Sequence, residues 1–170
     1  MTKWLTRTVL ALLALALLTV LAGRFGLLRG TAPSDLGVRD GRLKAPSATA
    51  NSVSSQALLW PGREAAQIEP LPLRGSGPET IARLKSVVEA MPGAKVVEVR
   101  GDYLYAQFTT RLMKYVDDTE FWFDPVAGVV QVRSASRLGE KDFNVNRERV
   151  EAIRLRLAGP DPSPTAAKGQ

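Results

Sequence analysis

Sixteen uncharged residues stand between Arg7 and Arg24, and this run is the strongest constraint on what the chain can fold into. As a helix rising about 1.5 Å per residue it would extend ~24 Å, short of the ~30 Å hydrocarbon core of a bilayer. The two flanking arginine side chains can extend to the interface, and Trp4 suits the headgroup region. The sequence therefore predicts a basic region over 1–7 and a transmembrane anchor or signal segment over 8–28.

Two interpretations of this segment stay open. An uncleaved segment makes a single-pass membrane protein, whereas a signal peptide would start with Lys3 and Arg7 and be cleaved after Val20-Leu21-Ala22. More basic residues follow the segment than precede it, which favours a cytoplasmic domain, but a short basic and then apolar N-terminus is typical of exported proteins. We expect the protein in the inner cell membrane, with its domain on the periplasmic, extracytoplasmic side.

The composition excludes several kinds of chemistry. The chain has no histidine and no cysteine, so disulfides, thiol nucleophiles, histidine general bases and Cys/His zinc sites are ruled out. Of the formal charge of +6, a surplus of +5 lies in residues 1–44, where seven Lys/Arg stand against two Asp. Because a nucleic-acid footprint lies on the folded domain, we expect no nucleic-acid partner. We also expect no metal and no cofactor.

The distribution of glycine, proline and apolar residues divides the rest of the chain. Residues 29–56 are rich in Gly, Ala, Pro and Ser, which indicates a linker or extended segment. Residues 158–170 contain Gly159-Pro160 and no apolar periodicity, which predicts a disordered tail. The folded domain is therefore expected over 57–157.

A β-hairpin is the clearest local pattern within this domain. Val97 and Val99 alternate with charged residues, Gly101-Asp102 forms a turn, and apolar residues alternate again from Leu104. A two-residue turn pairs Val99 with Leu104 and Val97 with Ala106, so the apolar side chains share one face.

Helices and further strands surround the hairpin. A capping-box pattern begins a helix at Ser76, and Pro92-Gly93 ends it. Strands are expected over 118–123 and 129–136, and a second helix over 144–157. The order predicts an α+β fold: a four-stranded antiparallel sheet flanked by two helices, preceded by the N-terminal transmembrane or signal segment.

A polar cluster on the last two strands is the expected site. Arg133 and Arg137 share one face of their strand. The register that pairs Trp122 with Val130 places Asp117 diagonally beside both arginines. The sequence thus predicts an Arg133–Asp117–Arg137 cluster.

A different strand register would place Asp118, rather than Asp117, beside the two arginines. A slip of one residue replaces Asp117 by Asp118 as the facing group. These two side chains point to opposite faces and cannot readily chelate one ion together. Asp118 and Glu120 do share a face, but we interpret them as edge-strand charges rather than as a metal site or an acid/base pair.

Two interpretations of the cluster are weighed. Arginine offers a planar fork of donors suited to carboxylate or phosphate, and Asn144 lies near a helix N-terminus, so the cluster is a candidate anion site. The alternative is a network of salt bridges that ties the sheet to the last helix through Arg147 and Arg149. Ser134 and Ser136 have no histidine to activate them as nucleophiles.

The second half of the domain resembles a known family. Residues 131–139 read QVRSASRLG, and residues 142–151 read DFNVNRERVE. This stretch is similar to the signature RSxSRxGxxDxGxNRxRVE of the domain of unknown function 1499 family. The runs DDTEF at 117–121 and NSVSSQ at 51–56 resemble further segments of that family.

The chain also departs from the family pattern. Many members carry a cysteine pair where Ala45 and Ser52 stand here, so whatever that pair does is absent, and Phe143 stands where glycine is usual. The resemblance implies an N-terminal membrane or export segment, and it implies no reaction. The candidate anion-binding or partner-binding residues, from the strand pattern and the resemblance together, are Asp117, Asp118, Arg133, Ser134, Ser136, Arg137, Asp142, Asn144, Asn146 and Arg147.

These observations favour a membrane-anchored envelope domain that binds a partner protein or an anionic small ligand and has no catalytic activity. One alternative is a carboxylate- or serine-based hydrolase or transferase, which requires a pocket with strongly perturbed carboxylates. The other is a lipid-binding domain, which requires an apolar void between the sheet and the last helix.

Overall fold

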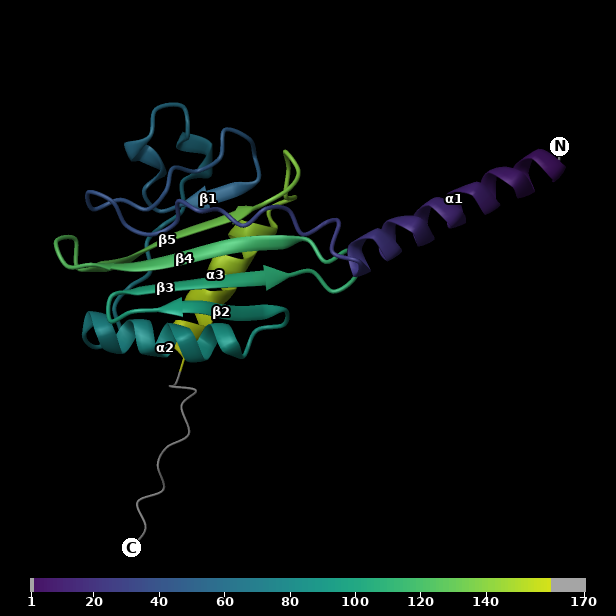
Figure 1. Cartoon of the computed structure of the whole chain (residues 1–170). Helices are drawn as coiled ribbons and strands as arrows, with labels where there is room; N and C mark the ends of the chain where they lie inside the picture. The colour runs from purple at the N-terminus through teal and green to yellow at the C-terminus, as the bar shows by residue number, and fades with distance from the viewer. Residues whose placement is uncertain (1, 160–170) are drawn as a thin grey trace, which may run out of the picture.

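The computed structural model describes residues 2–159, so the predicted tail over 158–170 lies outside the described residues except for its first two. The elements follow in the order α1 (Thr2–Arg24), β1 (Ser52–Ser54), η1 (Ala57–Leu59), η2 (Glu64–Ala66), α2 (Gly77–Glu89), β2 (Ala94–Val99), β3 (Tyr103–Thr109), β4 (Val116–Asp124), β5 (Val129–Ser136) and α3 (Val145–Ala158). Figure 1 shows α1 projecting from one end of an α+β domain. The predicted fold class is confirmed.

The N-terminal helix is long and apolar enough to cross a membrane, and a signal sequence has the same properties. Its 23 residues correspond to ~34 Å of helix, which matches the hydrocarbon thickness better than the uncharged run alone. The helix ends against the domain: a Cβ on Gly23 would clash with the backbone oxygen of Met113, in the β3–β4 turn. Only glycine allows this close approach.

The sheet has five antiparallel strands in the order β1-β5-β4-β3-β2, so the prediction of four strands was wrong. The additional strand is β1, which comes from the segment expected to be a linker and pairs Val53 with Ser134 of β5. A three-residue strand is too short to show the alternation by which strands are recognised in a sequence.

The predicted hairpin forms, with a register shift. Val99 pairs with Leu104 as predicted, but an irregularity between Val96 and Glu98 places Val96 opposite Ala106. Val97 is left 46% exposed. A bulge on this edge strand therefore gives the position that packs against the core to Val96, which is partly buried, a change that alternation alone does not reveal.

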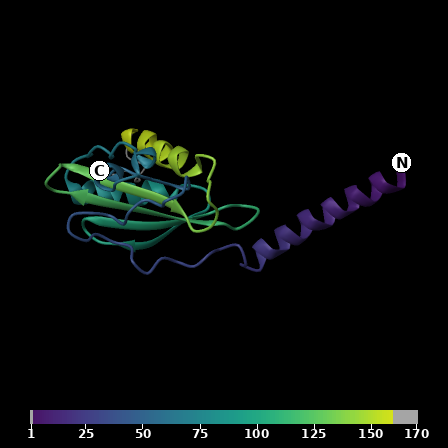
Figure 2. The same ribbon diagram turned by 90° about the horizontal axis from the view of Figure 1, so that it is seen from above.

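The sheet is covered on both faces. α2 and α3 pack on one face, where buried aliphatic side chains and Phe121 form the main core. On the other face, Leu43 packs with Tyr103, Tyr105 and Trp122. Figure 2 shows α3 on one side of the sheet and the N-terminal extended segment on the other. This segment therefore forms part of the domain, and its contacts shape the site described next.

Both predicted domain helices are present, with different N-terminal caps. The capping box of α2 forms between Ser76 and Glu79. Asn144 occupies the N-cap position of α3, but its side chain makes no capping hydrogen bond. Asp142 accepts hydrogen bonds from the backbone N–H groups of Asn144 and Asn146 instead. Asp142 thus caps the first turn of α3 in place of Asn144.

Candidate functional site

The register of β4 and β5 decides which carboxylate faces the arginines. Trp122 pairs with Gln131 rather than with Val130, and Asp118 pairs with Ala135. The predicted Arg133–Asp117–Arg137 cluster is therefore wrong, because Asp117 lies on the opposite face. The one-residue slip considered from the sequence is the register that the structure adopts, and it reverses the face of every side chain on the strand.

On the helix-covered face, Asp117 pairs with α3. Arg149 Nη2 lies 2.5 Å from Asp117 Oδ2, and its guanidinium stacks over the ring of Phe108, 4.6 Å from the centroid. Arg149 Nη1 also donates to the oxygens of Ser134 and Asn146. This ion pair ties the sheet to α3, which is the structural role weighed for the cluster.

Asn146 is the centre of a buried network at the N-terminus of α3. Its amide oxygen accepts a hydrogen bond from Ser134 Oγ at 2.6 Å. Its amide nitrogen donates to the backbone oxygen of Asn51, to Ser136 Oγ and to Asp142 Oδ2, at 2.8 to 3.1 Å. The side chain is fully buried. Four of the ten candidate residues therefore hold one another in place.

Arg147 has a different set of partners. Its guanidinium donates to the backbone oxygens of Gln67 and Ala65, which fixes the segment around η2 against α3. Asn144 makes no side-chain hydrogen bond, and both it and Phe143 have a positive φ, 69° and 53°. The glycine usual in the family at the phenylalanine position suits such a backbone, since glycine adopts positive φ without steric cost.

On the opposite face, Asp118 and Arg137 form a bidentate pair. Arg137 Nε and Nη2 donate to the two carboxylate oxygens at 2.8 and 2.7 Å. Tyr105 donates its hydroxyl to Asp118 at 2.5 Å. The hydrogen bond to Asp118 raises the pKa of Arg137, and burial raises the pKa of Tyr105.

Arg133 and Glu120 form a second pair on this face with incomplete hydrogen bonding. Arg133 Nη1 and Glu120 Oε2 lie 3.5 Å apart, and neither atom has a hydrogen-bond partner. Glu120 Oε1 is satisfied by the hydroxyl of Tyr103 and the backbone N–H of Gly37. Burial raises the pKa of Glu120 and lowers that of Arg133, since both are removed from water.

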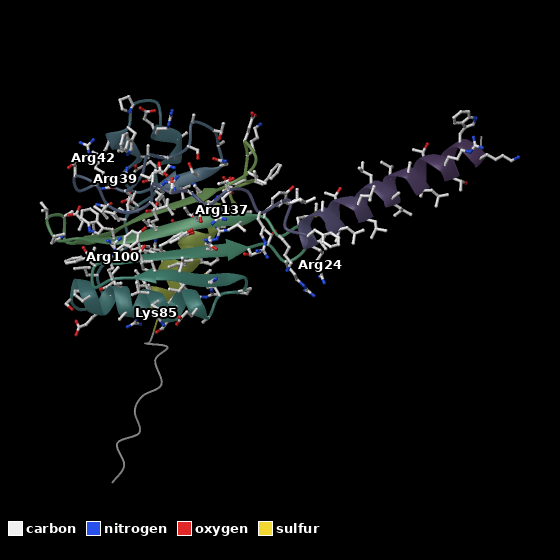
Figure 3. The ribbon with its side chains drawn as sticks, viewed as in Figure 1. Arg24, Arg39, Arg42, Lys85, Arg100 and Arg137 are labelled. Atoms are coloured by element: carbon white, nitrogen blue, oxygen red, sulfur yellow. The ribbon has the colours of Figure 1, made fainter. Side chains whose placement is uncertain are left out.

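Four of the candidate residues line one pocket of about 330 Å³, together with residues of the N-terminal segment. These four are Asp118, Arg133, Ser136 and Arg137. The N-terminal segment contributes Lys44, Thr31 and Ser47 among others. Figure 3 shows Arg137 on the side of the sheet nearer α1, whereas Arg39 and Arg42 lie on the side away from it. We call this hollow the arginine pocket.

Several hydrogen-bond donors of the arginine pocket are unused in the described part of the chain. Arg133 donates only from Nε, to the backbone oxygen of Ala45, and Arg137 Nη1 makes no hydrogen bond. Lys44 uses one of its three N–H groups, toward Asp35. Sequence reasoning missed Lys44 as a site residue, because it lines the pocket beside Arg133, which stands about 90 positions later in the chain. The only sequence signal for Lys44 was its place among several basic residues.

The carboxylates of the site do not assemble a metal centre. Among residues 2–159, no three acidic side chains converge in a way that would hold a metal ion. Asp118 and Glu120 share a face as predicted from alternation, but their interpretation as edge-strand charges was wrong, because β4 is the central strand and both side chains are buried. Each carboxylate is bound to its own arginine and tyrosine.

Comparison with known proteins gives one result. The family model described as "Protein of unknown function (DUF1499)" matches residues 33–157, more than half of the chain. Searches of curated proteins and of solved structures find no match. The matched range includes the Asn146 network, both domain helices up to the last residue of α3, and all residues that line the arginine pocket except Thr31. The chain therefore belongs to the DUF1499 family of proteins of unknown function.

Proposed function

We propose that this protein is a membrane-anchored binding domain whose ligand carries a phosphate-like anionic group, bound in the arginine pocket. α1 is the anchor, and the domain lies on the periplasmic side of the inner membrane. The proposal includes no catalytic step. The observation that carries it is Arg133: it is only 4% exposed, it lines the pocket, and within residues 2–159 its Nη1 and Nη2 make no hydrogen bond.

Unused donors on a buried guanidinium have a cost. A buried polar group without a partner loses about 1–3 kcal/mol relative to one that is hydrogen-bonded. An anion in the pocket would supply acceptors to Arg133, to the free Nη1 of Arg137 and to the ammonium group of Lys44. Thr31 and Ser47 add hydroxyls that make no side-chain hydrogen bond of their own. This donor set suits the three oxygens of a phosphate.

The charge balance predicts moderate affinity. Lys44, Arg133 and Arg137 each face a carboxylate already, respectively Asp35, Glu120 and Asp118. A ligand therefore gains hydrogen bonds and little net Coulomb attraction. We expect binding to depend on the geometry of the anion, and to weaken less with salt than binding at an exposed basic patch would.

The test is calorimetric titration of the full-length protein in nanodiscs of neutral lipid, with inorganic phosphate as the probe. Lys44→Glu should weaken phosphate binding about tenfold or more, through the loss of one charge-assisted hydrogen bond and the gain of a repulsion. The matched control is Lys85→Glu, because Lys85 forms a similarly exposed ion pair with Glu89 on α2. It should leave binding unchanged.

Two further arms separate the possible sources of the anion. Nanodiscs containing phosphatidic acid present the phosphate as a lipid headgroup, and they should compete with free phosphate if the natural ligand is a lipid. Glycerol phosphate in neutral nanodiscs tests a soluble ligand. Absence of phosphate binding, or equal losses in Lys44→Glu and Lys85→Glu, would contradict the proposal.

A further inference from the structure

The end of the domain next to α1 has an unusual surface. Phe143 is 86% exposed and Leu112 is 61% exposed, and Leu138, Val145 and Tyr115 are each about two-fifths exposed. Most of these side chains line a hollow of about 420 Å³ at the start of β4, the end of β5 and the start of α3. Leu28, four residues after α1, lines the same hollow. We call this surface the proximal patch.

α1 fixes the direction in which the proximal patch faces. Figures 1 and 2 both show α1 leaving the domain at the end formed by the β3–β4 turn. The contact of Gly23 with Met113 and the approach of Gly30 to Arg137 and Leu138 place the helix end directly beside the patch. If α1 spans a bilayer, the patch faces the surface of that bilayer.

Basic residues lie in the segments that carry the apolar surface. Arg24 ends α1 and Arg29 follows it, and Arg111, Lys114 and Lys141 lie in the two loops that carry the patch. The acidic residues of these two loops are Glu140 and Asp142, and the carboxylate of Asp142 caps α3. Anionic lipid headgroups attract such a set by about 1 kcal/mol for each Lys or Arg close to the surface.

We infer that the proximal patch rests on the bilayer and that its hollow takes lipid hydrocarbon, with Phe143 and Leu112 inserted at the interface. The apolar area, the basic residues of its segments and the attached helix all fit a lipid surface, as in interfacial anchors. The inference rests on α1 as the anchor and is independent of a ligand in the arginine pocket. It also places the pocket, lined by Thr31 and Pro33, close to the headgroups.

The chain contains no cysteine, so single cysteines report on single positions without further changes. The variants are Phe143→Cys and Leu112→Cys, and the matched control is Val126→Cys. Val126 is an apolar residue that is 96% exposed, in the β4–β5 turn at the opposite end of the sheet. Each full-length variant carries a polarity-sensitive fluorophore in vesicles of phosphatidylcholine and phosphatidylglycerol.

The inference predicts a blue-shifted emission at positions 143 and 112, quenched when the acyl chains are brominated, and no quenching at position 126. Emission at all three positions that matches water would overturn it, provided that alkaline carbonate leaves the protein in the vesicles. A blue shift without quenching by brominated lipid would also overturn it, in favour of a protein covering the patch. Release of the protein by carbonate would contradict the anchor itself, and the inference with it.

Discussion

The amide nitrogen of Asn146 donates a hydrogen bond of 3.1 Å to the backbone oxygen of Asn51, 95 residues earlier in the chain. Asn51 in turn bonds through its own side chain to the backbone oxygen of Gly139 at 2.6 Å. These bonds join the start of β1, the loop after β5 and the first turn of α3. The two asparagines therefore explain how the arginine pocket and the proximal patch keep their shape at one end of the sheet.

Replacing Asn146 should destabilise the domain strongly. Asn146→Ala leaves the buried hydroxyl of Ser134 and the oxygen of Asn51 short of partners, which should cost about 2–3 kcal/mol. The control is Asn144→Gly, because Asn144 makes no side-chain hydrogen bond and has a φ of 69° that glycine accepts. Urea unfolding of both variants in detergent should show a large loss for the first and almost none for the second. Equal losses would mean that the network is not what holds α3.

The buried pair Arg137–Asp118 should contribute far more to the free energy of unfolding than an exposed pair of arginine and carboxylate. Arg137→Ala leaves the buried carboxylate of Asp118 with the hydroxyl of Tyr105 but without its cationic partner, and should cost about 3–5 kcal/mol. Arg100→Ala breaks the exposed pair with Glu98 and should cost less than about 1 kcal/mol. Thermal unfolding of the two variants measures the difference. Similar melting temperatures would show that Asp118 finds another partner.

Phe143 should lower the stability of the folded domain and strengthen its binding to membranes. Its φ of 53° suits glycine, so Phe143→Gly should leave the free energy of unfolding unchanged or raise it by up to about 1 kcal/mol. After α1 is removed by cleavage at a protease site inserted behind it, the Phe143→Gly domain should bind anionic vesicles more weakly than the wild-type domain in a flotation assay. A clear loss of stability would show that the phenyl ring packs within the domain.

Glu120 gives a pH dependence whose sign follows from its burial. Burial raises the pKa of this carboxyl above its unfolded value of 4.5. At a pH between 4.5 and the native pKa, the native state therefore holds a proton that the unfolded state has released. The stability that this proton contributes is present below 4.5 and is lost as the pH rises through the higher native pKa. Wild type should therefore lose stability over this window relative to Glu120→Gln. The pKa values of Asp35, Glu64 and Glu79 are lowered, so these carboxyls change the stability only below about 4.5. Their contribution is the same in wild type and in Glu120→Gln, and it drops out of the comparison. A parallel pH profile for the two proteins would contradict the assignment.

The same carboxyl should oppose anion binding. Removing its charge leaves Arg133 without the carboxylate with which it is paired, so Glu120→Gln should tighten sulfate binding, and acidification should do the same in wild type. Sulfate is the suitable probe because its own charge does not change over this range. Weaker binding in Glu120→Gln would indicate that the carboxylate positions Arg133 for the ligand.

The sequence predicted those features that depend on local patterns. The helix expected over 144–157 forms as α3, and the capping box at Ser76 forms. The strand register depended on long-range contacts, because a slip of one residue leaves the apolar alternation of each strand intact and reverses the faces of Asp117 and Asp118.

The rest of the site could not be predicted from local patterns either. Lys44 reaches the pocket through an extended segment with neither helical nor strand periodicity. The proximal patch depends on where α1 meets the domain, through the contact of Gly23 with Met113. No pattern in the sequence encodes that contact, since the two residues are 90 positions apart.

The most direct test of the proposed function is to observe the guanidinium groups themselves. In full-length protein labelled with 15N-arginine in nanodiscs, the side-chain NMR signals of Arg133 and Arg149 are assigned by substitution and followed during phosphate titration. The account predicts a saturable shift of the Arg133 signals, while those of Arg149, on the helix-covered face, stay in place. Arg133 signals that do not move at saturating phosphate would contradict the claim that the arginine pocket is an anion site.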